Sequence, residues 1–322
     1  MKLDLTLFDA NPNTTADSSL SAEMRTYYSD YLIDNAKPNL VHDQFGQKHP
    51  IPKNGGKTIQ FRKFVPFSKA TAPLSEGITP DGGSLSVTQV TSSVEQYGYY
   101  VTISDMLMLT AIDNTLVETT KLLGAQAGST LDTITREVLN GGTSVMYSGG
   151  KEAREELDAT CKLTVDDIFK AARFLKTQNA PKINGSYVAI IHPDVAYDLM
   201  RDDEWIDVHK YSSTSEIFEG EIGKLGGVRF VESTEAKIFA KGGADARDVY
   251  STLVLGANAY GVTEVSGGGL THIVKQLGSG GTADPLNQRA TAGWKGTKTA
   301  ERLVENYMIR IESASSFESG EN

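Results

Sequence analysis

The chain has 322 residues, of which 39% are hydrophobic and 22% are charged, and 41 acidic against 31 basic residues give a formal net charge of −10. This composition is typical of a globular protein of one or two domains and excludes an intrinsically disordered chain. The sequence contains no block of Lys and Arg, which argues against a protein that grips nucleic acid tightly.

The first 56 residues are predicted to form an N-terminal arm with a short helix. Residues 1–22 are polar and rich in turn formers, and a helical segment is expected over Met24–Ala36, ending before Pro38. Acids and asparagines interrupt this stretch, so it lacks the apolar core of a secretory signal. No run approaches eighteen apolar residues, and the single cysteine, Cys161, cannot form an intrachain disulfide, which fits a reducing cytoplasm.

Residues 57–103 are predicted to form one very long hairpin. Ile59 and Phe61 alternate with polar residues, and the same alternation returns at Tyr97–Ile103. The intervening stretch 72-APLSEGITPDGGSLS-86 contains two prolines and three glycines, as expected for a wide polar tip. Limbs of about 15–20 residues at ~3.3 Å per residue would reach about 50–60 Å.

Such a hairpin needs a surface to lie on, because an isolated two-stranded ribbon is only marginally stable. No strand of matching length stands nearby in the sequence, so the hairpin is expected to pack on another copy of the chain. Folding back onto its own domain is the alternative that the residues alone leave open. The residues expected at the assembly interface are Arg62, Lys63, Phe64, Phe67, Leu74, Glu76, Asp81, Leu85 and Val87.

A long helix is predicted over residues 115–140. Thr115 with Glu118 has the spacing of a capping box, in which a hydroxyl and a carboxylate each satisfy a free amide of the first turn. An apolar stripe follows with steps of three, four and seven residues, and Asn140-Gly141-Gly142 provides the stop. At 1.5 Å per residue the helix would be about 39 Å long.

The rest of the chain reads as a mixture of helices and strands. A second, shorter capping box, Thr164 with Asp167, opens a helix, and a short helix is expected over Val195–Met200. Residues 278–288 are expected to be a flexible connection. Strands are predicted at Tyr187–Ile191, Val228–Val231, Tyr250–Leu255, Ala259–Val265, Ile273–Gln276 and Leu303–Ile311.

The glycine-rich stretch 219-EGEIGKLGGVRF-230 has the composition of a phosphate-binding loop but not its spacing. Gly220 and Gly223 are too close together, and Leu225 follows Lys224 where a hydroxyl should bind Mg²⁺. The run that follows is β-branched and aromatic, so the order is a turn and then a strand. We predict a plain turn here.

The remaining polar residues show no catalytic or metal-binding pattern. The five histidines have no metal-ligand spacing, and Cys161 has no second cysteine. His192 before Pro193 is more simply a polar residue that ends a strand, and the acids at 166–167 and 202–204 fit helix ends. A pair of distant carboxylates for glycoside hydrolysis stays open. No catalytic residue, metal or cofactor is predicted.

The order of these parts resembles the major capsid protein of tailed bacteriophages, the shell fold first known from coliphage Hong Kong 97. Four phrases carry the resemblance in the same order along the chain. They are 190-IIHPDVAYDLM-200, 220-GEIGKLGGVRFVES-233 followed by 237-KIF-239, 250-YSTLVLGANAYG-261 and 293-GWKGTKTAERLVENYMIRIESA-314.

The resemblance implies an α+β phage major capsid fold with four parts. These are an arm and short helix at 1–56, an extended hairpin loop at 57–103, a peripheral domain at 104–163 and 289–322 with its spine helix 115–140, and an α/β axial domain at 164–288. Some relatives crosslink neighbours through a Lys–Asn bond, but no matching residues can be placed here.

The implied function is structural. Hexamers and pentamers of the chain would form an icosahedral shell around double-stranded DNA, with weak non-specific contact to the DNA, with portal and scaffolding proteins as partners and with no membrane. The shell would assemble in the bacterial host cytoplasm and persist in the virion. Two alternatives remain: an encapsulin-like compartment of the same fold, and an α/β enzyme that uses Lys224 or His192 on a small ligand.

Overall fold

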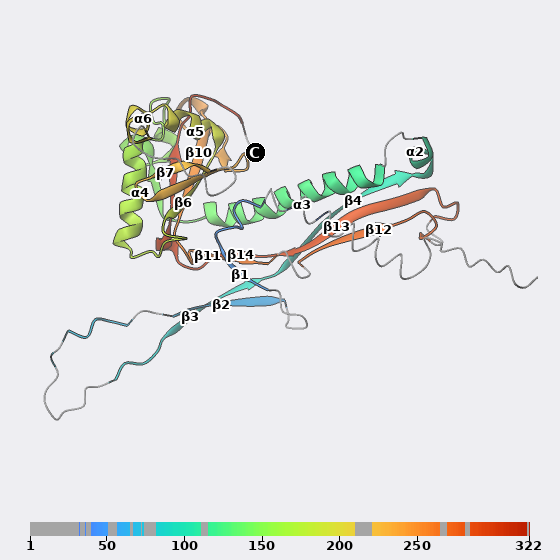
Figure 1. The fold of residues 1–322 in the computed structure, drawn as a ribbon, viewed down its shortest axis with the longest axis horizontal. Coiled ribbons are helices and arrows are strands. Elements are labelled where there is room, and N and C mark those ends of the chain that lie inside the picture. The colour runs from blue at the N-terminus through green and yellow to red at the C-terminus, as the bar shows by residue number, and fades with distance from the viewer. Residues whose placement is uncertain are drawn as a thin grey trace, which may run out of the picture. The chain divides into compact units, whose positions relative to one another are not determined.

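A computed structural model describes residues 32, 36, 40–50, 57–64, 67–71, 73, 82–110, 115–209, 221–264, 269–280, 284–320 and 322. The chain divides into two compact units. Unit 1 comprises Met1–Asn39, Tyr97–Gly128 and Leu270–Gly296, and unit 2 comprises Leu40–Gln96, Ser129–Gly269 and Thr297–Asn322. Figure 1 labels the helices and strands of both units. Among the described residues, no helix is long and apolar enough to cross a membrane.

The chain is an α+β protein. The helices are α2 (Asp105–Thr110), α3 (Thr115–Asn140), α4 (Val165–Thr177), α5 (Pro193–Met200) and α6 (Asp203–His209). The strands are β1 (Gln47–His49), β2 (Thr58–Phe64), β3 (Val87–Ser93), β4 (Glu95–Ser104), β5 (Val145–Tyr147), β6 (Tyr187–Ile191), β7 (Glu221–Leu225), β8 (Val228–Glu232), β9 (Ile238–Phe239), β10 (Val249–Leu255), β11 (Tyr260–Thr263), β12 (Leu270–Lys275), β13 (Arg289–Lys298), β14 (Ala300–Arg302) and β15 (Met308–Ser313).

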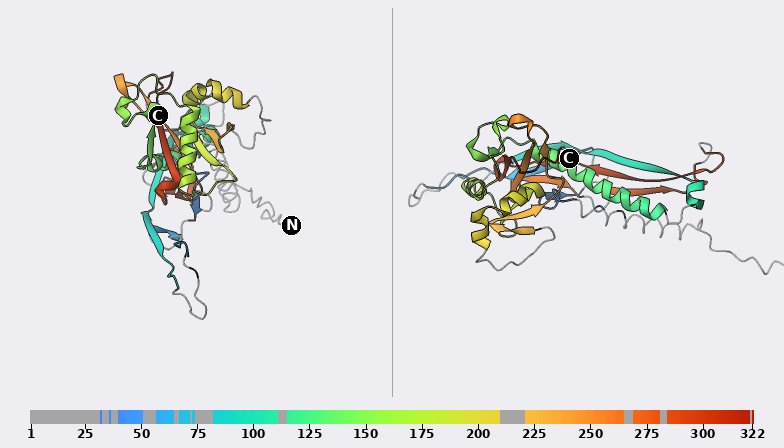
Figure 2. Two further views of the ribbon diagram at one scale, coloured as in Figure 1. Left: turned by 90° about the vertical axis from the view of Figure 1, so that its left-hand side faces the viewer. Right: turned by 90° about the horizontal axis from the view of Figure 1, so that it is seen from above.

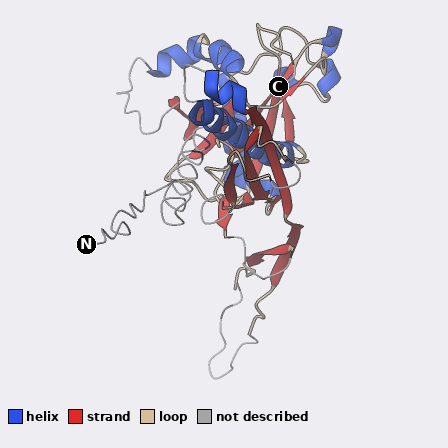
Figure 3. Cartoon of the chain, turned by 90° about the vertical axis from the view of Figure 1, so that its right-hand side faces the viewer, coloured by secondary structure: helices blue, strands red, loops and turns tan. Residues whose placement is uncertain are grey.

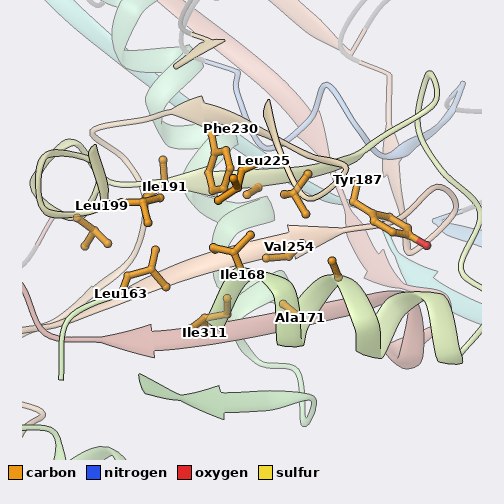
Figure 4. Packing of buried hydrophobic residues seen from close by; sticks show 14 of the residues in the cluster. Leu163, Ile168, Ala171, Tyr187, Ile191, Leu199, Leu225, Phe230, Val254 and Ile311 are labelled. Atoms are coloured by element: carbon orange, nitrogen blue, oxygen red, sulfur yellow. The ribbon is translucent and has the colours of Figure 1, made fainter. Parts of the chain in front are cut away.

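Unit 2 is built on a seven-stranded sheet in the order β5-β15-β10-β6-β8-β7, with β9 paired to β10. Strands β6 and β10 are buried along their whole length, as expected for central strands with apolar side chains on both faces. Helix α4 packs its apolar side on this sheet, and Figure 4 shows Ile168 and Ala171 of α4 facing Val254 and Ile311 of the strands. This layer is the main core of the unit.

Two local signals in unit 2 act as the sequence predicts. Thr164 caps α4, its hydroxyl accepting from the Asp167 amide while the Asp167 side chain accepts in return, so the predicted capping box is confirmed. The predicted turn is confirmed at Gly226-Gly227, but residues 221–225 before it form β7, a strand that was not predicted. Both glycines have positive φ, +61° and +90°, the conformation of a two-residue hairpin turn, and it joins β7 to β8.

A buried polar cluster joins the segment before the hairpin to α3 within unit 2. Nδ1 of His42 lies 2.6 Å from Oδ2 of Asp132 on the helix. Thr135 on the same helix donates to Asp43 at 2.6 Å, and Asp43 forms a buried ion pair with Lys298. These groups fix residues 40–49 against α3, and β1 then pairs in parallel with β11.

Unit 1 contains a three-stranded sheet in the order β12-β13-β4, packed on the first part of α3. Trp294 of β13 is buried and donates through Nε1 to Gln126 of α3 at 3.1 Å. The predicted bounds of the helix are confirmed. Residues 111–114 lie outside the described part of the chain, so the predicted capping box at Thr115 stays a prediction.

The predicted long hairpin is corrected by the strand pairing. Seven residues of β2 pair with β3, from Thr58↔Ser93 to Phe64↔Val87. The alternating stretch Tyr97–Ile103 does not continue this ribbon, because it lies in β4 and pairs with β13. The partner of this stretch is β13, a strand of the same ten-residue length as β4 that lies far away in the sequence.

Several smaller predictions are also settled. The last strand begins at Met308 and not at Leu303, because residues 305–307 form a 3-10 turn. Strand β12 begins at Leu270 and ends one residue before Gln276. Leu32 and Ala36 are helical and buried, while the rest of Met24–Ala36 lies outside the described residues.

Candidate assembly surfaces

The base of the β2–β3 ribbon is anchored on unit 2. Phe61 is 1% exposed, and its ring lies edge-on to His49 with ring centroids 4.9 Å apart. A Cβ on Gly261 would lie 2.6 Å from Cδ1 of Phe61, so only glycine leaves room for the ring. Ile59 and Val94 complete this small core. The ribbon therefore has one face held by its own chain.

Beyond this base the ribbon exposes apolar side chains. Phe67 is 67% exposed, Leu85 is 62% exposed, and Val87 at the start of β3 is 39% exposed. Figures 2 and 3 show the β2–β3 ribbon standing apart from the seven-stranded sheet of the same unit. Exposed large apolar side chains in one segment are typical of a surface that another molecule covers.

The predicted interface residues thus fall into three groups. Phe67, Leu85 and Val87 are exposed, and Arg62 is exposed on β2. Lys63 and Phe64 lie on β2, paired with Thr88 and Val87, while their side chains are outside the described part. The remaining three, which are Leu74, Glu76 and Asp81, lie outside the described residues.

A second exposed apolar surface lies on unit 1 and was missed from the sequence. Helix α2 has no buried residue, and Leu109 is 80% exposed. The Asp105 amide donates to the Gln288 carbonyl at 3.0 Å, which places α2 beside the start of β13, and Leu286 nearby in sequence is also exposed. The run Met106–Leu109 could have indicated this exposed surface, because it has too many consecutive apolar residues for an amphipathic helix.

The outer face of the unit 1 sheet carries further exposed apolar groups. Trp294 faces α3, so its neighbour Gly293 lies on the opposite face, and Ile273 pairs with Gly293 in register. A Cβ on Gly293 would lie 2.7 Å from Cβ of Tyr100, which places that tyrosine on the same outer face. Tyr100 is 70% exposed.

Of the residues considered for small-molecule chemistry, His192 has a structural role. His192 is the N-cap of α5, its Nδ1 accepting from the Asp194 amide at 3.2 Å. Burial lowers the pKa of His192 although the Asp194 carboxylate opposes this. Lys224 is exposed on β7, and Cys161 is buried. Within the described ranges, no three His, Cys, Asp or Glu residues gather as metal ligands.

The fold is similar to those of viral shells. The capsid of the cyanophage P-SCSP1u matches with a TM-score of 0.65 and 16% identity, over 86% of this chain and 89% of that chain. The capsid of Ralstonia phage GP4 matches with a TM-score of 0.66 and 15% identity, over 82% and 85%. A virus-like particle from Pyrococcus furiosus matches with a TM-score of 0.53 and 10% identity, over 90% and 99%. The structure therefore has the shell fold of tailed phages.

The sequence identifies the family. The model of the phage capsid protein family matches residues 88–300, well over half of the chain, and the chain belongs to that family. No curated protein matches its sequence. It is a structural major capsid protein, which assembles into an oligomeric shell and resides in the virion.

Proposed function

We propose that this capsid protein forms hexamers and pentamers of an icosahedral shell around double-stranded DNA, and that its hairpin lies across the neighbouring subunit. The proposal rests on the change in side-chain exposure along the ribbon. Phe61 is buried at the base, whereas Phe67 and Leu85 are exposed farther out. A surface that its own chain leaves uncovered is available to a second copy, and apolar burial is the main driving force of stable association.

The domain assignment belongs to the same proposal. The proposal assigns residues 1–56 to an arm, 57–93 to the hairpin loop, 104–163 with 289–322 to a peripheral domain, and 164–288 to an axial domain whose loops meet around the capsomer centre. Residues 94–103, which the sequence had placed in the hairpin, are left out of it because Glu95–Ser104 forms β4. The two compact units follow a different division, because β4 and β12 fall together in unit 1. The corrected pairing places the end of the ribbon at Ser93.

The proposed partners are other copies, a portal, a scaffolding protein and packaged DNA. The chain acts on none of them as an enzyme, and it assembles in the host cytoplasm. The net charge of −10 supports a wall that repels DNA at short range and lets it slide, and salt weakens that repulsion. Particles whose lumen proved basic would rule out this electrostatic role and leave the shell proposal intact.

A protein-filled compartment of the same fold is the alternative that the sequence left open. The family match favours the phage shell. The two differ in cargo. Purified particles from infected cells should contain nuclease-protected double-stranded DNA, whereas a compartment would contain protein.

The assembly test is a pair of substitutions in the exposed part of the hairpin. The variant F67D/L85D should remain a folded subunit and fail to close shells, because charge replaces the apolar contact. The matched control is I206D on α6, which changes another exposed apolar residue and should still assemble. Deleting residues 70–84 should give the same soluble, assembly-deficient subunit. Shells of normal form from either hairpin variant, seen by negative-stain microscopy and sedimentation, would refute the proposal.

A further inference from the structure

The last residues of the sequence run along unit 2 as a separate docked segment. Two side chains of helix α5 hold its first part. Asp198 accepts from the Ser316 amide at 2.7 Å and from the hydroxyl of Ser315 at 2.8 Å. The ring of Phe317 meets Tyr197 edge-on, with centroids 5.2 Å apart. The docked segment is defined here as residues 315–320 together with Asn322, the part of this stretch that the structure describes.

The middle of the docked segment is held by strand β10 and the residue before it. The Ser319 amide donates to the hydroxyl of Tyr250 at 3.1 Å, and the Gly320 amide donates to Asp248 at 2.9 Å. Burial, together with a hydrogen bond to Asp194, raises the pKa of Tyr250 to about 12, so this hydroxyl stays protonated at neutral pH. Most of these partners are side chains, and no described residue of the segment forms a strand with the sheet.

The end of the segment is held differently, through the carboxamide of Asn322. Its Nδ2 donates to the carbonyls of Thr234 at 2.8 Å and Ala236 at 2.7 Å. Its Oδ1 accepts from the amide of Ile238 at 3.2 Å and from Nη1 of Arg136 at 3.2 Å. Both donors and both acceptor positions of the carboxamide are used, although the residue as a whole is exposed.

The side of unit 2 that receives Asn322 is built around the buried Arg136. Arg136 on α3 is 2% exposed and also donates to the Glu235 carbonyl at 3.0 Å. Its Nη2 donates to the carbonyl of Asn322 itself at 3.1 Å. Two carbonyls, one amide and one guanidinium therefore converge on a single side chain from α3 and from residues 234–238.

This arrangement selects asparagine by chemistry. Aspartate has no donor for the carbonyls of Thr234 and Ala236, so its charge would face two acceptors. Alanine offers no side-chain donor or acceptor and keeps only the main-chain oxygen that accepts from Arg136. Glutamine has the right groups on a stem longer by one methylene, so it cannot place both ends at once on a fixed set of partners.

We propose that Arg136 and residues 234–238 form an asparagine-specific peptide site, and that the docked segment of the same chain is its ligand. Binding of the Asn322 side chain at this site holds the docked segment against α3, α5 and β10. The proposal concerns each subunit and does not depend on how subunits assemble. Its failure would leave the shell proposal untouched.

The test compares hydrogen exchange in the full-length variants N322A, N322D and N322Q. Each should speed exchange of the Ile238 amide and of residues 315–320 about tenfold or more, since several hydrogen bonds are lost together. The control is S319A, which removes a hydroxyl from the same segment and leaves the carboxamide in place; it should not change the exchange of Ile238. Full protection in N322D would show that Arg136 holds the segment by charge alone, and would overturn the specificity.

A second measurement shows whether the segment binds its own chain. An amidated peptide of residues 314–322, labelled at its N-terminus, should bind N322A in fluorescence anisotropy, and the same peptide with Asp in place of Asn should bind about tenfold more weakly or not at all. Protection of Ile238 in the unaltered protein should not change with protein concentration. Protection that grows with concentration would mean that a second copy supplies the segment, and would overturn the assignment to the same chain.

Discussion

Replacing Phe61 by alanine should release the ribbon while leaving the rest of unit 2 folded. The ring is buried between His49 and Gly261, and a buried Phe→Ala change costs about 3–5 kcal/mol. The seven paired residues of β2 and β3 cannot replace this anchor, because an isolated two-stranded ribbon is marginal in water. The substitution therefore lowers the stability of the ribbon and not that of the main core.

The expected size of the effect follows from that free energy. Since 1.4 kcal/mol is a factor of ten, a loss of about 3 kcal/mol in local stability should speed exchange of the β2 and β3 amides about a hundredfold. Hydrogen exchange read by mass spectrometry over Thr58–Phe64 and Val87–Ser93 measures it. The control is L85A, which truncates an exposed side chain and should leave the isolated subunit's exchange unchanged.

Either of two results would refute the reasoning about the anchor. If F61A keeps full protection of β2 and β3 in the unassembled subunit, Phe61 is not what holds the ribbon. If instead the seven-stranded sheet loses protection together with the ribbon, the ribbon is part of the main cooperative unit. The same variant should close shells poorly, because a released ribbon must be ordered again at each contact.

Three further predictions concern stability within unit 2. K298M should destabilise the unit by about 3–5 kcal/mol in urea unfolding, because it leaves Asp43 as a buried unpaired charge. D43L/K298M should recover most of this loss, and equal losses in the two variants would contradict the prediction. T164A should cost about 1 kcal/mol by removing the N-cap of α4, and unchanged unfolding would show that the cap contributes nothing. Burial alone would raise the pKa of Asp198, but the hydrogen bonds that it accepts from the docked segment and from Lys162 lower this pKa below the ordinary 3.8. The stability that the Asp198 carboxylate contributes is therefore complete above pH 3.8 and is lost as the pH falls through the lowered pKa. D198N should flatten this dependence of stability on acid pH, and an unchanged slope would refute the assignment.

The sequence was sufficient where a local signal and burial agreed. The capping box at Thr164, the paired glycines at 226–227 and the apolar run Tyr187–Ile191 each determine a boundary through short-range chemistry. Fold class and family followed from the order of such pieces. The anchor at Phe61 was visible only as one member of an alternating pattern, because its partner Gly261 lies 200 residues away.

The failures came where the same local pattern fits two pairings. Strands β3 and β4 follow each other with only Val94 between them, and alternation cannot show that one pairs with β2 and the next with β13. Strand β13 was missed because it contains Gly293, Gly296 and two lysines, residues with low strand propensity. Gly293 is required by close strand contact, since a Cβ there would lie 2.8 Å from the Tyr99 carbonyl.

The corrected ribbon changes what the shell proposal requires. A hairpin running to residue 103 would have needed a neighbour for most of its length, and could not have been stable alone. The observed ribbon is shorter, is anchored through Phe61, and leaves uncovered mainly the part around Phe67 and Leu85. A subunit of this kind can fold first and assemble afterwards, because the contact with another copy adds stability to a surface that is already in place. If the subunit folds before it assembles, it should be folded and monodisperse at low concentration. Amide exchange at Val87 should then slow on assembly, while exchange at Phe61 stays constant. Equal slowing at both positions would mean that the neighbouring subunit, and not the chain's own core, holds the base of the ribbon.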